Sequence, residues 1–368
     1  MKILYITRKF PPTIGGMQTQ SRQFYENISK RNDVFLIAWG HSQFFLPFFI
    51  IYAFVRAAII LSTKDVEIIQ LGDFVLSPLG SLLKTLFKKP VLTISHGRDS
   101  VYTSPFYDHF ILGSAKKLDR VICVSRNNMK TLASRGIPED KLRVIPNGIN
   151  LGDANINDLN REQSLDLIEK RFGINLREKN NILSVSRLVP KKGIREFVED
   201  VLPSISKRVD NACFVIAGDG CEKERIYQAV NRLNLKDRVY LLGNVEHGSA
   251  IYRALFSVSN VFVMPNIRVS DDAEGFGVVA LEAAVNKTPL VAYDVDGISE
   301  AVHDKENGIL IKEKNAELFS DAVCGFLKDS VLRQNFTNRA REYVAKKFSW
   351  DRIIGMYEEE YLQLLKRG

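Results

Sequence analysis

The 368-residue chain has only four cysteines, and no two of them have the short spacing of a zinc or redox motif. Cys123 and Cys213 lie inside apolar runs, where a thiol packs as a small hydrophobe. This usage argues against a disulfide framework and predicts a reducing, cytoplasmic compartment. The opening segment MKILYIT is too short for a secretory signal peptide. The chain also lacks short-period repeats and low-complexity tracts, so nothing indicates a repeat array.

Neither half of the chain has more acidic than basic residues. Residues 1–165 contain 21 Lys and Arg against 13 Asp and Glu, whereas residues 166–368 contain 30 of each. The whole net charge of +8 therefore lies in the first half. A basic domain beside a neutral one indicates an anionic partner: nucleic acid, anionic lipid or a phosphorylated substrate. The charge can also be purely solubilising. No nucleic-acid-binding motif accompanies it, which makes nucleic acid the weakest of these readings.

Short apolar runs bounded by turn residues alternate with longer amphipathic segments. They predict strands at 2–7, 34–39, 66–71, 90–95, 119–125, 142–147, 181–188, 213–218, 239–244, 260–265 and 289–294. Helices are predicted between them, in the second half at 195–208, 222–233 and 276–286. This alternation is typical of parallel βαβ units. The predicted fold class is α/β, with two tandem Rossmann-like, doubly wound domains that face each other across a cleft. Such a cleft is the default ligand site.

The domain boundary is predicted in the polar stretch GDANINDLNREQSLD, residues 152–166, which shows no strand pattern. We place the N-terminal domain at residues 1–160 and the C-terminal domain at 161–347.

One apolar run, FFLPFFIIYAFVRAAIIL at 44–61, comes close to the about 20 residues that cross a membrane. It contains Pro47 and Arg56 and is followed by Lys64 and Asp65. We therefore predict a buried or surface-lying helix of the first domain rather than a span. The run is more aromatic than a core helix usually needs.

Two strand-to-helix turns have features of phosphate-binding loops. In the first, Gly15 and Gly16 precede a helix predicted from near Met17, so a phosphate could approach backbone N–H groups at the positive helix end. A plain tight turn remains the alternative. In the second, SVSRLVPKKG at 184–193, Arg187 follows a strand, and two lysines precede the next helix. Cations there oppose the helix dipole, so either a bound diphosphate or simple solvation accounts for them.

The segment EGFGVVALEAA at 274–284 places two carboxylates on either side of a glycine-containing turn. The helix is predicted from about Val278, so Glu282 lies on its second turn and Glu274 lies just outside it. One loop can then present a carboxylate to a sugar, N–H groups to a phosphate and a second carboxylate to a ribose. The alternative is that Glu274 only favours the helix start and Glu282 is solvated.

Taken in order, these motifs resemble glycosyltransferase family 4, whose members have the GT-B fold. The resemblance runs through nearly the whole chain: Gly15-Gly16, SHGRD at 95–99, IPNGI at 145–149, SRLVPKKG, IAGDG at 216–220, LGNV at 242–245, EGFGVVALEA and FSWDRIIGMYEEEY at 348–361. It implies that the closing helix, within residues 348–368, crosses back to the N-terminal domain.

The resemblance also implies roles for individual residues. Glu274 would hold hydroxyls of the donor sugar and Glu282 the nucleotide ribose. His96 would lie beside the reacting sugar. The diphosphate would be bound by the remaining members of the set: Arg187, Lys192, the phosphate loop at Gly16, and the backbone of Phe276, Gly277 and Val278.

Two further motifs are not assigned the functions that they suggest. The Asp-x-Asp of residues 294–296 is typical of metal sites in another glycosyltransferase fold, but a divalent ion needs several convergent oxygens, so no metal site is predicted. The glycines of IAGDG do not complete a dinucleotide fingerprint, since Lys223 occupies the third glycine position.

The sequence thus predicts a retaining, metal-independent hexosyltransferase without a cofactor. It would use a UDP- or GDP-sugar and a hydroxyl acceptor, expected to be a lipid-linked glycan or glycolipid of surface polysaccharide synthesis. The acceptor would bring the enzyme to the inner face of the cytoplasmic membrane, with the N-terminal domain contacting anionic lipid. Two alternatives stay open: a nucleotide-sugar epimerase of the same fold, and a non-catalytic nucleotide-sugar-binding protein.

Overall fold

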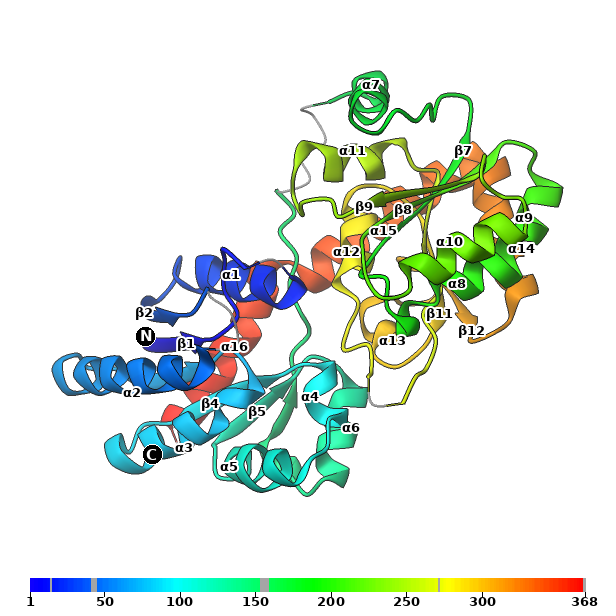
Figure 1. Ribbon diagram of the computed structural model, residues 1–368. Helices are drawn as coiled ribbons and strands as arrows, with labels where there is room; N and C mark the ends of the chain where they lie inside the picture. The colour runs from blue at the N-terminus through cyan, green and yellow to red at the C-terminus, as the bar shows by residue number, and fades with distance from the viewer. Residues whose placement is uncertain (14, 41–44, 153–158, 271, 367–368) are drawn as a thin grey trace. The chain divides into compact units, whose positions relative to one another are not determined.

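The computed structural model describes residues 1–13, 15–40, 45–152, 159–270 and 272–366. Its contacts divide the chain into two compact units (Figure 1). The first unit contains Met1–Gly148, Asp271–Phe276 and Phe348–Gly368, and the second contains Ile149–Ser270 and Gly277–Lys347. The boundary between the units therefore also falls between Phe276 and Gly277, inside the EGFG turn.

The first unit is built on a parallel six-stranded sheet with the order β2-β1-β3-β4-β5-β6. Strands such as KILYIT are apolar throughout because both faces of the sheet are covered by helices. The strands are β1 (Lys2–Thr7), β2 (Asp33–Ala38), β3 (Ile68–Leu71), β4 (Val91–Ser95), β5 (Arg120–Cys123) and β6 (Leu142–Val144).

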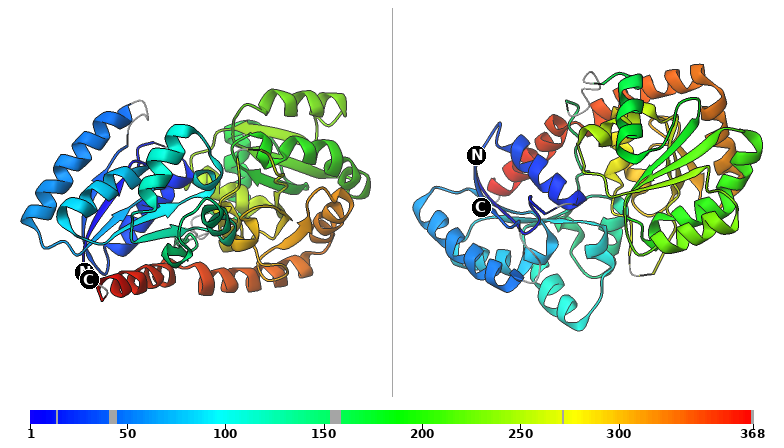
Figure 2. Two further views of the ribbon diagram at one scale, coloured as in Figure 1. Left: turned by 90° about the horizontal axis from the view of Figure 1, so that it is seen from below. Right: turned by 45° about the horizontal axis from the view of Figure 1, so that its top comes forward.

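Helical segments connect these strands and cover both faces. They are α1 (Gly16–Ile28), α2 (Leu46–Thr63), η2 (Phe74–Leu76), α3 (Ser77–Phe87), α4 (Gly97–Val101), the π-helical η3 (Tyr107–Leu112), α5 (Gly113–Ala115), α6 (Arg126–Ser134), η4 (Glu139–Lys141) and α16 (Trp350–Leu365). The chain steps from β1 to β2 in one direction and through β3 to β6 in the other, so right-handed crossovers put α1 and α2 on opposite faces. Figure 2 shows α2 and α16 on opposite sides of this sheet, and α16 packs against α1.

Helix α16 is fixed to the first unit by polar contacts as well as packing. The indole N–H of Trp350 donates to Gln23 Oε1 at 3.0 Å, and Tyr361 donates to Gln70 Oε1 at 2.9 Å. The buried Arg120 donates through Nε to Glu360 Oε2 at 2.8 Å. A buried arginine needs such a partner, because an unpaired charge in the interior is strongly destabilising.

The apolar run predicted at 44–61 forms α2, within the described residues from Phe45 onward. Pro47 occupies the first turn, where its missing N–H costs no hydrogen bond. The helix buries Phe49, Ala53, Ala57 and Leu61 in the core and leaves its other side exposed. By length and composition alone, α2 is long and apolar enough to cross a membrane, with 22% of the segment buried.

The second unit is built on another parallel six-stranded sheet, with the order β12-β11-β10-β7-β8-β9. Its strands are β7 (Asn180–Val185), β8 (Ala212–Ala217), β9 (Val239–Gly243), β10 (Val261–Met264), β11 (Leu290–Asp294) and β12 (Ile309–Lys312). The prediction missed the edge strand β12, which is short and only half-buried.

The helical segments of this unit are α7 (Arg161–Phe172), η6 (Pro190–Lys192), α8 (Ile194–Glu196), the π-helical η7 (Phe197–Val201), α9 (Leu202–Arg208), α10 (Lys223–Arg232), α11 (Ala250–Val258), α12 (Val278–Val285), α13 (Ile298–Ala301), α14 (Ala316–Lys328) and α15 (Ser330–Phe348). One predicted boundary was wrong, and one predicted helix is present with a local change in hydrogen bonding. The predicted linker ran to residue 166, but α7 already begins at Arg161 behind the N-cap Asn160, and residues 153–158 lie outside the described part. The helix predicted at 195–208 changes to π-helical hydrogen bonding over η7, just before Pro203, which cannot donate.

Candidate active site

His96 occupies the turn at the carboxyl end of β4. Its backbone N–H donates to Asp99 Oδ2 at 2.8 Å, and its carbonyl oxygen accepts from Asn128 Nδ2 at 3.1 Å. The same Asn128 amide donates to Ser95 Oγ at 3.2 Å. The turn is thus held from both sides, at the sheet edge where doubly wound proteins bind ligands.

The imidazole of His96 lines a small cavity within the first unit. Trp350 and Tyr357 of α16 contribute to its wall, and the other lining residues are Tyr5, Gln20, Ser21, Phe24, Gly72, Ile94, Pro146, Asn147 and Ile353. Burial lowers the pKa of His96, against the opposing effect of the Asp73 charge, so the imidazole is neutral at pH 7. Gln20 Oε1 is buried here and has no hydrogen-bond partner among the described residues.

Two carboxylates beside His96 have different environments. Asp73 is fully buried and accepts from Arg8 Nε at 2.8 Å and from the Val75 N–H at 3.1 Å. Burial raises the pKa of Asp99 to about 7, although the His96 backbone N–H partly offsets this shift. Asp73 is thus paired with a cation, whereas Asp99 is about half ionised near neutral pH.

Glycines bring the Glu274 segment against the His96 turn. A Cβ atom at Gly97 would lie 2.5 Å from Gly275 N and 2.4 Å from Gly275 Cα. A Cβ atom at Gly275 would lie 2.6 Å from Gly97 N. The two backbones can approach this closely only because both residues lack a side chain. Glu274, which is half-buried, is thereby placed one residue from the contact on one side, and His96 one residue from it on the other.

In the second unit, Arg187 follows β7 in a loop that the neighbouring loop holds in place. The Leu188 N–H donates to Asp219 O at 2.9 Å, and the Ser186 N–H donates to Ala217 O at 3.0 Å. A Cβ atom at Gly218 would lie 1.8 Å from Ser186 O, so the glycines of IAGDG serve this close approach. The Arg187 side chain itself is exposed.

Lys191 and Lys192 lie in the η6 turn, and α8 begins only at Ile194. The alternative of two solvated lysines was wrong for Lys191, which is buried. Gly193 has φ +62°, and a Cβ atom there would lie 1.8 Å from Pro265 O. This contact joins the lysine turn to the carboxyl end of β10, the strand that leads toward the EGFG turn.

Glu282 is anchored by two side chains that the sequence analysis did not identify. His247 Nε2 donates to Glu282 Oε1 at 2.7 Å, and Tyr252 donates its hydroxyl proton to Oε2. Only 12% of the Glu282 side chain is exposed, so the solvated alternative was wrong. A weak sequence signal existed: Ser249 caps α11, the helix that follows β9, and its hydroxyl accepts from the Tyr252 N–H on the first turn.

Helix α12 begins in the middle of the signature. Gly277 adopts a left-handed conformation with φ +85°, and Val278 is the first helical residue. Phe276 is buried, with its ring 5.9 Å from that of Phe348 in an edge-to-face contact. Since the unit boundary follows Phe276, the two glutamates are grouped with different units.

The remaining predicted residues are also located. Gly16 is the first residue of α1, and a Cβ atom there would meet no atom within 4 Å, so its backbone is open on that side. In the Asp-x-Asp motif of residues 294–296, Asp294 is exposed, whereas Asp296 Oδ1 lies 3.9 Å from Arg268 Nε. Arg268 also pairs with Glu313 at 2.8 Å.

The structure thus groups the predicted site residues into two sets. The first unit holds Gly16, His96, Glu274 and Phe276, and the second holds Arg187, Lys192, Gly277, Val278 and Glu282.

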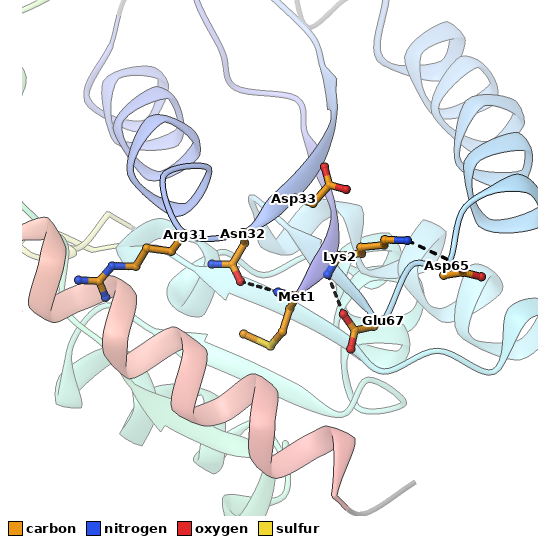
Figure 3. Close-up of a pocket in the computed structure, with 7 residues that line it drawn as sticks. All are labelled: Met1, Lys2, Arg31, Asn32, Asp33, Asp65 and Glu67. Atoms are coloured by element: carbon orange, nitrogen blue, oxygen red, sulfur yellow. Dashed lines mark hydrogen bonds and ion pairs between the residues drawn. The ribbon is translucent and has the colours of Figure 1, made fainter.

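A separate depression lies at the opposite, amino-terminal edge of the first sheet (Figure 3). Its ion pair joins Lys2 to Asp65 at 3.5 Å, and the Lys2 N–H donates to Glu67 Oε2 at 2.7 Å. Figure 3 also shows Arg31 directed toward the C-terminal helix rather than into the depression. Ligands of doubly wound sheets bind at the carboxyl ends, so this depression is not assigned to the reaction.

Comparison with known proteins agrees with this geometry. Residues 167–343 match the family model described as glycosyl transferases group 1, and residues 14–153 match that of glycosyltransferase family 4. The chain belongs to glycosyltransferase family 4. This family 4 enzyme is 29% identical to an uncharacterised glycosyltransferase of Methanocaldococcus jannaschii, over 96% of each chain.

A second relative is the GDP-mannose-dependent alpha-(1-6)-phosphatidylinositol monomannoside mannosyltransferase of Mycobacterium tuberculosis. The family 4 enzyme is 25% identical to it, again over 96% of both chains. Among solved structures, Anabaena HepE in complex with UDP superposes with a TM-score of 0.76 at 16% identity, covering 99% of this chain and 100% of that one. The predicted α/β fold class, GT-B with two Rossmann-like domains, is therefore confirmed.

Proposed function

We propose that this glycosyltransferase moves a hexose from a UDP- or GDP-sugar to a hydroxyl acceptor, with retention at the anomeric carbon and without a metal ion. The observation that carries the proposal is the Gly97–Gly275 contact, because it brings the Glu274 segment to the neutral His96. A carboxylate accepts hydrogen bonds from sugar hydroxyls, and a neutral imidazole can donate one and accept another. The names of the relatives agree with a nucleotide donor, since one uses GDP-mannose and another was solved with UDP.

Charge on the leaving diphosphate would be balanced by the second unit's own groups. Arg187 is exposed at the end of β7, Lys192 lies in η6, and the N-terminus of α12 is at Val278. Positive groups fixed before the reaction stabilise the developing charge of the transition state. Glu282, already oriented by His247 and Tyr252, would bind the nucleotide ribose.

Retention would follow from attack on the same face as the departing group. The acceptor oxygen forms the new bond to the anomeric carbon as the bond to the diphosphate breaks. The departing diphosphate oxygen accepts the acceptor's proton. The diphosphate itself then serves as base, and no protein nucleophile is required.

Metal independence is supported by the environment of the Asp-x-Asp motif. Asp296 lies beside Arg268, and a guanidinium group there competes with a divalent ion for the carboxylate. Asp294→Asn and Asp296→Asn variants should therefore remain largely active.

We further propose that the acceptor is a lipid-linked glycan or glycolipid of surface polysaccharide synthesis, used in the cytoplasm at the inner membrane face. The basic first half and the apolar α2 favour an acceptor of this class. The Mycobacterium relative is named for a phosphatidylinositol-based acceptor.

The test combines three measurements on the purified chain. A thermal-shift screen of nucleotide sugars identifies the donor, because a ligand at a hundred times its Kd stabilises by about 2.7 kcal/mol. Turnover in excess chelator then tests the metal, and proton NMR of the product tests the configuration. Activity that disappears in chelator and returns with manganese would overturn the metal-free proposal, and an inverted product would overturn retention.

Two other activities predict different nucleotide release. An epimerase converts the donor without any acceptor, and a non-catalytic binder releases no nucleotide at all. Free nucleotide that appears only when acceptor is present identifies transfer.

A further inference from the structure

Large apolar side chains on the surface are concentrated in one part of the first unit. Of the sixteen exposed large hydrophobic residues in the described chain, eleven lie between Phe45 and Phe110. Helix α16, on the opposite face of the same sheet, has Leu362 as its one exposed large hydrophobic residue in the described chain. An apolar area of this extent on a soluble protein indicates a binding surface.

Helix α2 has two apolar sides with different surroundings. Its buried side repeats every four residues, at Phe49, Ala53, Ala57 and Leu61, and packs into the core. Its exposed side carries Phe48, Ile51, Tyr52, Val55 and Ile59, with exposed fractions between 48% and 67%. An interfacial helix normally needs a polar side toward water, but here that side is occupied by the protein's own core.

Helix α3 lies beside α2 and extends the exposed surface (Figure 1). Leu82 and Leu86 of α3 are 47% and 55% exposed. We call these seven side chains of α2 and α3 the apolar surface. The segment η3 packs on the other side of α3, and there Phe106 and Phe110 are exposed with their rings 4.9 Å apart.

Basic residues outnumber acidic ones around the apolar surface, although the exposed Asp65 follows Lys64. Helices α2 and α3 contain no Asp or Glu, and their charged residues are Arg56 and Lys84. Lys64, Lys88 and Lys89 follow directly after the two helices. Lys84 is paired with Asp119, whereas Arg56, Lys64 and Lys88 are exposed. Pairing this surface with a second copy of itself would bring cations against cations, whereas anionic lipid head groups complement them.

We propose that the apolar surface docks on an anionic lipid bilayer, with α2 lying in the plane of the interface. The exposed side of α2 would enter the boundary between head groups and acyl chains, and the flanking cations would contact the head groups. Helix α2 cannot span the bilayer in the folded enzyme, because its other side completes the core of the first unit.

This inference rests on the proposed function only for the reason why docking would be useful: an enzyme with a lipid-linked acceptor must work at the membrane. His96 belongs to the same unit, and η3 begins eleven residues after it. A docked first unit would keep its acceptor-side residues near the membrane surface throughout the reaction. Docking itself can be measured without donor, acceptor or turnover.

The experiment is co-sedimentation of the full chain with vesicles of phosphatidylcholine alone or with about one-third phosphatidylglycerol. We expect binding to the anionic vesicles and little to the neutral ones. The triple variant Phe48→Ser, Ile51→Ser, Tyr52→Ser should lose at least about 100-fold in partition coefficient. The control Val331→Ser, Leu332→Ser removes two exposed apolar side chains of α15 in the second unit and should bind like the unchanged chain.

A variant of two flanking lysines tests the docking independently, in case the triple variant does not fold. Lys88→Glu with Lys89→Glu should weaken binding by about 30-fold, since each basic residue near an anionic surface contributes about 1 kcal/mol. The matched control is Lys346→Glu with Lys347→Glu, another adjacent pair of lysines, on α15.

Three results would overturn the inference. The first is that the unchanged chain does not bind anionic vesicles. The second is that the α2 and lysine variants bind as well as their controls. The third is that the chain forms dimers which the triple variant abolishes, because the surface would then serve a second copy. Transfer to a water-soluble acceptor, measured in parallel without vesicles, reports on the proposed function alone.

Discussion

The carboxyl edges of the two sheets present different charged groups, although both sheets are parallel, six-stranded and connected in the same style. At the first edge, His96 is neutral, the Asp73 charge is balanced by Arg8, and burial raises the pKa of Asp99 to about 7. At the second edge, the cations of Arg187 and Lys192 accompany an anchored Glu282. The shared fold determines that ligands bind at the carboxyl edge of each sheet. The loops at that edge supply the charged side chains, and these determine which part of the substrate can bind there.

The largest effect is expected when a cation at the carboxyl edge of the second sheet is removed. Arg187→Ala and Lys192→Ala should each raise the activation barrier by about 3–4 kcal/mol, as loss of one preorganised oxyanion partner does. Thermal stability should change little for Arg187→Ala, because that side chain is exposed. Steady-state rates and melting temperatures measure both effects. Lys236→Ala, an exposed lysine elsewhere in the unit, is the control, and normal turnover in either variant would refute the assignment.

At the first edge, Glu274→Gln keeps the shape of the side chain but removes its charge. We expect about a hundredfold loss of turnover, the size of effect that a misplacement of about 1 Å can produce, while nucleotide affinity stays within a few-fold. Gly97→Ala should cause a similar loss sterically, because the new methyl group would meet the Gly275 backbone. Calorimetric titration separates affinity from rate. A variant that transfers normally would show that Glu274 does not orient the sugar.

The raised pKa of Asp99 predicts a pH-dependent stability. Because the folded-state pKa of Asp99 is raised to about 7, the folded protein binds this proton more tightly than the unfolded chain. The stability associated with that proton is complete at low pH and is lost as pH rises through about 7. Asp99→Asn should therefore gain about 2.5 kcal/mol relative to the unchanged chain between pH 5 and pH 8.

Urea unfolding at those two pH values measures this difference. Burial lowers the pKa of His96, which destabilises the fold as pH falls below 6.5, but this effect is common to both proteins and cancels in the comparison. Asp237→Asn, at an exposed aspartate, is the control. A pH-independent difference between Asp99→Asn and the unchanged chain would contradict the assignment.

The smallest effect is expected at the anchor of Glu282. Tyr252→Phe removes one of the two side-chain donors to this carboxylate and leaves His247. A hydrogen bond to a charged group contributes about 1.5 kcal/mol, so KM for the donor should rise about tenfold with little change in kcat. Tyr227→Phe, at an exposed tyrosine, provides the control. A loss in kcat without a change in KM would mean that Tyr252 acts in the chemical step.

Much of the fold could be predicted because parallel strands buried on both faces are apolar and bounded by turn residues. The edge strand β12 escaped detection for the opposite reason, since Ile309–Lys312 is half-exposed and short. The start of α7 at Arg161 was mistaken for linker, because its polar N-cap and first turn resemble a loop in composition.

The site was predicted as a set of motifs but not as a set of contacts. Arg187 and the two glutamates stand out in the sequence because charge at a glycine-rich turn is unusual. His247 and Tyr252 do not stand out, because they reach Glu282 from 35 and 30 residues away. The burial of Lys191 and the Gly97–Gly275 contact depend on tertiary packing, which local sequence does not encode.

The attachment of α16 to the first unit has a consequence for biosynthesis. Trp350 and Tyr357 line the His96 cavity, and Glu360 pairs with the buried Arg120. The ribosome must therefore add roughly 200 residues after Gly148 before the first unit can close, which takes about 10–40 s at typical elongation rates. During that interval the second unit can complete its own sheet. The nascent chain thus exposes the surface that later holds α16, and a chaperone that recognises apolar nascent segments would find it there.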